Sequence, residues 1–180
     1  MIAFAYLPVV LYVGLEWLRK PPVKEIRHYC LSTYILGLAL FLLVVAPTAI
    51  YFMDPKPTIG NPWFVFGIMI GLSGVWIRAS AMHTLGRFFS RFIGIQQGHH
   101  LVQCGWYRYI RHPGYLGTML VFLGFAISTL SITAVIANLI VYLAAYSYRV
   151  SVEEQMLENQ FGEAYRRYRE SSWLLIPFVF

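Results

Sequence analysis

Apolar segments about as long as a membrane crossing constrain the fold of this chain more than any other feature. A helix needs about 20 apolar residues to cross the hydrocarbon core of a bilayer. Within hydrocarbon, a chain satisfies its backbone polar groups only as helices or as a closed barrel. The sequence therefore predicts an all-α integral membrane protein with five transmembrane helices in a single domain, residues 1–180. The five apolar segments are residues 1–18, 29–53, 61–79, 113–129 and 131–149.

The composition agrees with a chain that lies mostly in lipid. Hydrophobic residues make up 58% of the sequence and charged residues 12%, whereas a soluble domain carries about 25% charged residues. Cys30 and Cys104 lie far apart and form no CxxC pair, so neither a disulfide framework nor a metal site is indicated. The apolar beginning of the chain favours a retained first helix over a cleaved signal peptide.

The basic residues fall almost entirely on one side of the predicted helices. They lie between the first two segments, at or in the segment between the third and fourth (from Arg78 to Arg111) and from Arg149 onward, whereas Lys56 lies on the opposite side. The positive-inside rule therefore places the N-terminus outside and the C-terminus in the cytoplasm. Membrane topology accounts for the net charge of +6, and nucleic acid is not indicated as a partner.

The chain after residue 113 predicts a helical hairpin followed by a helix of another kind. Residues 128–131 separate the last two apolar segments. Over 152–170, apolar residues recur at spacings of four, four and three, which predicts an amphipathic helix on the cytoplasmic face rather than a sixth crossing. Earlier in the chain, Gly67, Gly71 and Gly74 share one face of the third segment and predict close helix packing.

A polar, aromatic-rich stretch directly precedes the fourth apolar segment. Pro113 suits the first position of a helix, because its missing N–H would be unpaired there. His112 would then cap that helix, whose free N–H groups favour an anionic group, and Tyr115 follows near one turn along. Spacing alone leaves a second interpretation equally open, in which His112 is an interfacial residue bonded to a loop carbonyl. Tyr107 alone would be typical of an aromatic membrane belt.

A second group of ionisable residues follows the fifth apolar segment. Arg149 and Glu153 are four residues apart and share a helix face. They form either a local salt bridge at the membrane surface or part of a polar cavity beside His112. Ionisable residues near membrane depth are functional candidates, since their desolvation is costly. Glu154 must face another direction and would support the site from behind.

Together these residues resemble the isoprenylcysteine carboxyl methyltransferase family and, more broadly, the membrane phospholipid methyltransferases. The resemblance covers a catalytic region over residues 84–178, including the hairpin, whereas residues 1–80 match only as three N-terminal spans. The matching residues are His99, Leu101, Val102, Gly105, Tyr107, Arg111, His112, Pro113, Tyr115, Gly117, Arg149, Glu153, Glu154, Phe161, Gly162, Tyr165, Tyr168, Ile176 and Pro177.

The resemblance implies a membrane methyltransferase that uses S-adenosylmethionine without a Rossmann domain, in agreement with the absence of a GxGxxG motif from the sequence. Arg149 corresponds to the substrate-contacting arginine of the family. A further cofactor contact would fall on Gln96 or Gln97. The implied cofactor-binding residues are His99, His100, Leu101, Val102, Tyr107, His112, Pro113, Gly114, Tyr115 and Glu153.

The residue types suit methyl transfer but leave the acceptor open. Such transfer requires alignment of donor and acceptor and exclusion of water. A carboxylate acceptor is ionised near neutral pH and needs no base, and Arg149 would orient it. An amine acceptor must lose a proton to a histidine or glutamate. We therefore expect isoprenylcysteine carboxyl O-methylation, with phospholipid N-methylation as the alternative. A sterol-reductase-like oxidoreductase and a non-catalytic membrane protein are less favoured.

The expected partners are membrane lipids and a lipid-like or prenylated substrate. A substrate of this kind would come from the bilayer rather than from water, and the hairpin at 113–149 offers a side entrance. No metal is expected in the reaction.

Overall fold

The structure is a computed structural model that describes residues 2–18, 30–58, 60–89 and 100–176. The regular elements of these residues are helical, and the extended pairing among them is an isolated parallel bridge between Ile110 and Trp173. The predicted all-helical class is therefore confirmed. The elements are η1 (Ile2–Tyr6), α1 (Leu7–Leu18), α2 (Cys30–Met53), α3 (Pro62–Leu85), η2 (Gly86–Phe88), η3 (Gly105–Arg108), α4 (Pro113–Ser128), α5 (Ile132–Phe161) and α6 (Glu163–Glu170).

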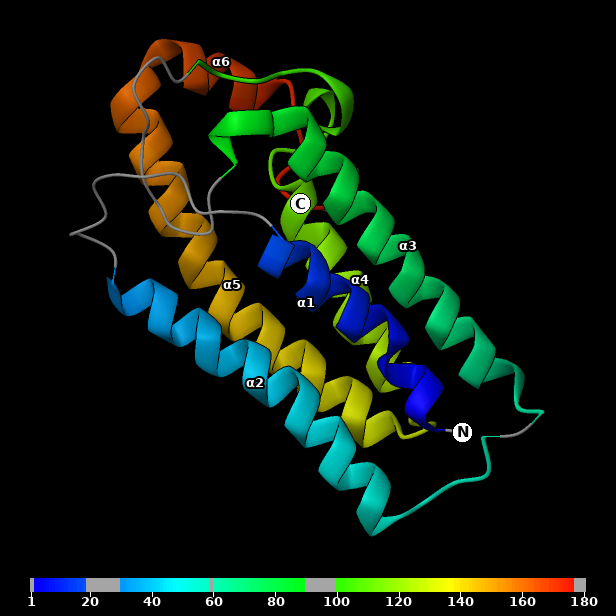
Figure 1. Cartoon of the computed structure of the whole chain (residues 1–180). Helices are drawn as coiled ribbons and strands as arrows, with labels where there is room; N and C mark the ends of the chain where they lie inside the picture. The colour runs from blue at the N-terminus through cyan, green and yellow to red at the C-terminus, as the bar shows by residue number, and fades with distance from the viewer. Residues whose placement is uncertain (1, 19–29, 59, 90–99, 177–180) are drawn as a thin grey trace.

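The long helices lie side by side, and α6 crosses one end of the bundle (Figure 1). In the described part of the chain, three helices are long and apolar enough to cross a membrane: Leu31–Met53, Pro62–Phe88 and Ile132–Phe161. Ile2–Leu18 and Pro113–Ser128 are also apolar but shorter. The chain is thus an integral membrane protein, and the count of five crossings stays a prediction.

Helices α3 and α4 pack closely because glycines face each other between them. A Cβ atom built on Gly74 would lie 2.6 Å from the carbonyl oxygen of Gly117 and from the amide nitrogen of Val121. A real Cβ atom does not lie this close to other atoms. The backbones of α3 and α4 can therefore approach to this distance only because the residues between them are glycines. The close packing predicted from the glycine face of the third apolar segment is confirmed.

Helix α5 is longer than its apolar segment, which ended at residue 149 in the sequence analysis. It continues to Phe161 and stops at Gly162, whose φ of 53° is unfavourable for residues with a side chain. The single helix expected over 152–170 is therefore two elements, the end of α5 and the short α6. In α6, Tyr165 and Tyr168 are buried, and the other residues are exposed.

Asn138 joins three helices within the apolar core. Its side chain lies on α5, and Nδ2 donates to the carbonyl oxygens of Leu43 on α2, at 3.2 Å, and Phe122 on α4, at 2.9 Å. Hydrogen bonds between helices stabilise bundles in a membrane, where water cannot compete for the same groups. These contacts fix α4 and α5 as neighbours, with the N-terminus of α4 beside the C-terminal half of α5.

Candidate active site

A cavity of about 400 Å³ lies at the end of the bundle that carries α6. Residues from both halves of the sequence line it, and the pairing of α4 with α5 brings them together. The lining includes most of the residues expected at the site: Leu101, Val102, Tyr107, His112, Gly114, Tyr115, Arg149 and Glu153.

The remaining expected residues lie elsewhere or were not described. Pro113 is buried at the first position of α4, beside the cavity rather than among its lining residues. His100 is exposed, and its ring meets Phe88 edge-on with centroids 4.8 Å apart. His99, like Gln96 and Gln97, lies outside the described residues.

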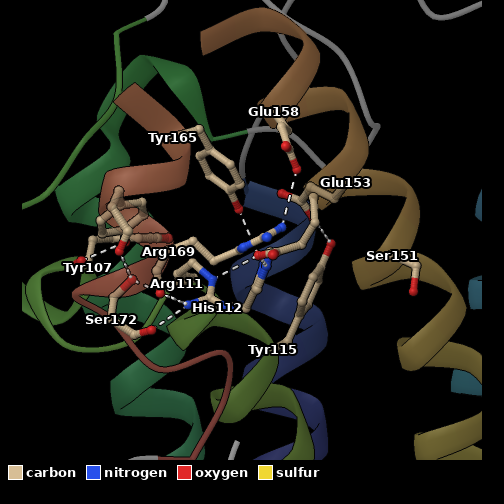
Figure 2. A network of polar contacts seen from close by, with 12 residues as sticks. Tyr107, Arg111, His112, Tyr115, Ser151, Glu153, Glu158, Tyr165, Arg169 and Ser172 are labelled. Carbon is tan, nitrogen blue, oxygen red and sulfur yellow. Dashed lines mark hydrogen bonds and ion pairs between the residues drawn. The ribbon is translucent and has the colours of Figure 1, made fainter. Parts of the chain in front are cut away.

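Tyr115 connects the two ionisable residues predicted from α5. Its hydroxyl donates to Oε2 of Glu153 at 2.6 Å and accepts from Nε of Arg149 at 3.2 Å. Figure 2 shows the ring of Tyr115 rising toward Glu153 from the start of α4. Arg149 also donates through Nη1 to Ser32 Oγ on α2, at 2.9 Å, and is 2% exposed. The guanidinium, the phenol and the carboxylate thus form a continuous polar wall.

Glu154 organises the segment that precedes α4. Its Oε1 accepts from Arg111 Nε at 3.0 Å, from His112 Nε2 at 2.9 Å and from the hydroxyl of Tyr165 at 2.7 Å. Because a carboxylate only accepts, Nε2 of His112 carries the hydrogen. Figure 2 shows the side chains of Arg111, His112 and Tyr165 pointing toward one another. Nε2 of His112 thus bonds a carboxylate rather than the loop carbonyl of the second interpretation.

The chain after α6 holds the same segment in place. The amide nitrogens of Arg111 and His112 donate to the carbonyl oxygens of Trp173, at 2.8 Å, and Leu174, at 3.1 Å. The hydroxyl of Tyr168 donates to the carbonyl oxygen of Tyr107 at 2.6 Å. Burial raises the pKa of the Tyr107 and Tyr168 phenols, so both remain protonated at neutral pH.

Arg78 and Glu16 also line the cavity, and the sequence analysis did not select them. Nη2 of Arg78 on α3 lies 2.7 Å from Oε1 of Glu16 on α1, and Arg78 is 6% exposed. Arg78 packs under the start of α4, where a Cβ on Gly114 would lie 3.0 Å from its Nη1. The sequence feature that could have identified them is the presence of one charged residue inside each of two apolar segments. Charged residues in such segments are candidates for function, because burying them in a membrane is costly.

The arrangement offers ionised groups of both signs beside aromatic and apolar walls. Its volume falls within the range of about 300–1,000 Å³ that is usual for small-molecule sites. Such a site can bind a ligand that carries a positive and a negative charge, and its apolar walls can exclude water from that ligand. Alignment and water exclusion are the requirements of a group transfer between bound partners.

Comparison with known proteins agrees with this chemistry. The phospholipid methyltransferase family model matches residues 62–164. Protein-S-isoprenylcysteine O-methyltransferase A of Arabidopsis thaliana is 33% identical over 150 residues, which cover 81% of this chain and 74% of that protein. The Saccharomyces cerevisiae protein-S-isoprenylcysteine O-methyltransferase is 32% identical over 117 residues, 64% of this chain and 49% of the yeast protein.

The fold is also that of a solved methyltransferase. The structure of the eukaryotic intramembrane Ras methyltransferase, isoprenylcysteine carboxyl methyltransferase, matches with a TM-score of 0.66 and 21% sequence identity. The match covers 98% of this chain and 63% of that chain. At this identity the likeness concerns the fold.

The helical membrane fold and these relatives define a membrane methyltransferase. The chain belongs to the isoprenylcysteine carboxyl methyltransferase family. The resemblance recognised in the sequence is confirmed, and O-methylation is favoured over phospholipid N-methylation, reduction or a non-catalytic role.

Proposed function

We propose that this chain transfers a methyl group from S-adenosylmethionine to the carboxylate of an isoprenylated or lipid-like acceptor at the cytoplasmic face of the membrane. The observation that carries the proposal is the convergence of Arg149, Tyr115 and Glu153 on one cavity. The names of the curated relatives support an isoprenylcysteine carboxylate as the acceptor class.

The residues present fit S-adenosylmethionine. Glu153 offers a carboxylate to its cationic part, and Leu101, Val102 and Tyr107 offer apolar and aromatic surface to its ring system. When bound, the cofactor supplies a methyl group attached to a positively charged sulfur. We assign cofactor binding to His99, His100, Leu101, Val102, Tyr107, His112, Pro113, Gly114, Tyr115 and Glu153, of which His99, His100 and Pro113 rest on the resemblance.

Arg149 anchors the acceptor carboxylate in this proposal. A carboxylate has an ordinary pKa near 3–4, so it is already ionised and requires no base. A guanidinium presents its donors in a planar fork that matches a carboxylate, and Tyr115 and Ser32 hold that fork in place. Since Arg149 is buried, its attraction for an anion is stronger than it would be in water.

We further propose five crossings within a single domain over 1–180, with the N-terminus outside and the C-terminus cytoplasmic. The distribution of Lys and Arg supports this orientation. The polar end of the cavity and α6 would then face the cytoplasm, where a soluble cofactor is available. Residues 84–178 would form the catalytic region. The N-terminal spans would add Glu16 and Arg78 to the lining of its cavity.

Two measurements on detergent-purified protein test the proposal. Calorimetric titration with S-adenosylhomocysteine should give binding by the wild type and loss of binding in Glu153→Ala and His112→Ala, with each variant checked for thermal unfolding. Transfer of a labelled methyl group should occur to an S-prenylated cysteine and not to its carboxamide. Failure of the folded wild type to bind S-adenosylhomocysteine, or transfer to phosphatidylethanolamine instead, would overturn the proposal.

A further inference from the structure

The cavity extends away from its polar wall along α2. Thr33, Leu36, Gly37 and Leu40 line it, and their spacing of three, four and seven residues puts them on one face of the helix. Ser32, which accepts from Arg149, marks the polar end of this face. With a rise of about 1.5 Å per residue, Gly37 lies about 7–8 Å farther along α2 and Leu40 about 12 Å.

The opposite side of this extension is α1, where Val13 also lines the cavity. The extension is therefore bounded by α1 and α2, rather than by the outer face of the α4–α5 hairpin expected from the sequence. We call the part of the cavity lined by Val13, Leu36, Gly37 and Leu40 the apolar arm. It is continuous with the polar wall, so a single ligand with an anionic head and an apolar chain matches both.

Close packing between helices does not explain why the residue at position 37 of the apolar arm is a glycine. A Cβ atom at this position would meet nothing within 4 Å. A glycine inside a helix costs about 1 kcal/mol relative to alanine, and here no close contact between helices requires it. The contrast is Gly117, where a Cβ would lie 2.7 Å from the backbone of α3. At position 37, the missing side chain leaves open volume in the wall of the cavity.

We propose that Gly37 determines how long an apolar chain the acceptor can insert between α1 and α2. This inference rests on the proposed function, since it identifies the occupant as the chain of the acceptor whose carboxylate lies at Arg149. A leucine at position 37 fills the arm partway along its length. Acceptors with a chain that ends before this position fit as before, whereas longer chains no longer do.

The test compares Gly37→Leu with Gly14→Leu, in protein reconstituted into lipid nanodiscs. Gly14 lies inside the neighbouring apolar helix, a Cβ there also meets nothing within 4 Å, and it is not among the residues that line the cavity. Both variants gain the same helix propensity. The acceptors are S-alkylated cysteines with chains of roughly one or two carbons and roughly twenty carbons. The short acceptor is chosen so that the cysteine and its chain together end before Gly37, about 7–8 Å from Ser32 along α2, and the long acceptor reaches well beyond it.

We expect Gly37→Leu to lower kcat/KM for the long acceptor by about tenfold or more, the effect of losing the space for a few methylene groups. The value for the short acceptor and the affinity for S-adenosylhomocysteine should change less than about threefold. Gly37→Ala should have a smaller effect in the same direction, and Gly14→Leu should have none.

The outcomes separate the two proposals. If the wild type methylates acceptors but Gly37→Leu affects both chain lengths equally, or affects neither, the role of Gly37 is overturned. The proposed function then stands. A folded wild type that neither binds S-adenosylhomocysteine nor methylates any acceptor overturns the proposed function, and with it the assignment of the arm to an acceptor chain.

Discussion

Glu153 and Glu154 are adjacent in α5, and their carboxylates accept hydrogen bonds from different residues at the start of α4. Oε2 of Glu153 accepts from the hydroxyl of Tyr115 at 2.6 Å, whereas Oε1 of Glu154 accepts from Nε2 of His112 at 2.9 Å. Consecutive residues of a helix differ in direction by about 100°. Glu153 consequently lines the cavity, and Glu154 faces Tyr165 on α6. The two carboxylates therefore have separable roles, ligand binding and positioning.

Glu153→Gln is expected to weaken binding of S-adenosylhomocysteine by about 10- to 100-fold, the usual worth of a hydrogen bond to a charged group. The amide oxygen still accepts from Tyr115, so the thermal unfolding temperature should stay close to that of the wild type. Calorimetric titration and a thermal melt measure the two effects. An unchanged affinity would remove Glu153 from the cofactor site.

Glu154→Gln should show the reverse pattern. The amide that replaces the carboxylate is a weaker acceptor for Arg111, His112 and Tyr165, so we expect a loss of about 1.5–3 kcal/mol of stability. Hydrogen exchange over residues 105–112 and 163–176 should increase together, because Glu154 ties these segments to each other. Increased exchange in only one of the segments would contradict this role.

Arg149→Lys tests the planar fork of the guanidinium rather than its charge. Lysine keeps the charge but cannot contact Tyr115 and Ser32 while also presenting paired donors to a carboxylate. We expect methyl transfer to fall about tenfold or more and affinity for S-adenosylhomocysteine to change less than about threefold. Arg166→Lys, on the exposed face of α6, is the matched control and should leave both unchanged. Equal losses of transfer and affinity would assign Arg149 to the cofactor instead.

Glu16→Gln is expected to destabilise the protein by about 3–5 kcal/mol, because it leaves the buried charge of Arg78 without this carboxylate. The double variant Glu16→Gln, Arg78→Met removes both charges and should recover much of that loss. Thermal unfolding of the single and double variants in one detergent measures the difference. A double variant no more stable than Glu16→Gln would indicate that the pair is not energetically coupled.

The contact of α6 with α5 should weaken in alkaline solution. Burial and the hydrogen bond to Glu154 raise the pKa of the Tyr165 phenol above its ordinary value of 10.0. The folded state therefore keeps a proton that the unfolded chain releases above pH 10, so this stabilisation is complete below pH 10 and is lost as pH rises beyond it. Unfolding temperatures measured from pH 8 to pH 12 should fall more steeply in the wild type than in Tyr165→Phe. Parallel curves would contradict the assignment.

Local chemistry made several features of this protein predictable. Apolar segments near the length of a bilayer crossing predicted the helices, and Pro113 predicted the start of α4. The spacing of Gly67, Gly71 and Gly74 predicted the close contact of α3, because a helix presents every third or fourth residue on one face. The same periodicity put Arg149 and Glu153 on one side of α5. These are properties of short stretches of chain.

Partners that come from different helices were not predictable in this way. Ser32 is 117 residues from Arg149, and Arg78 is 62 residues from Glu16. The unbroken continuation of α5 from the fifth apolar segment to Phe161 was also not predicted, and Glu154 within it is held by residues of α6 and of the stretch before α4. The sequence by itself determined an all-helical membrane chain with ionisable residues at particular positions. The tertiary structure alone decided which of these residues meet, because a buried charge is stabilised by whichever group helix packing brings within hydrogen-bonding distance.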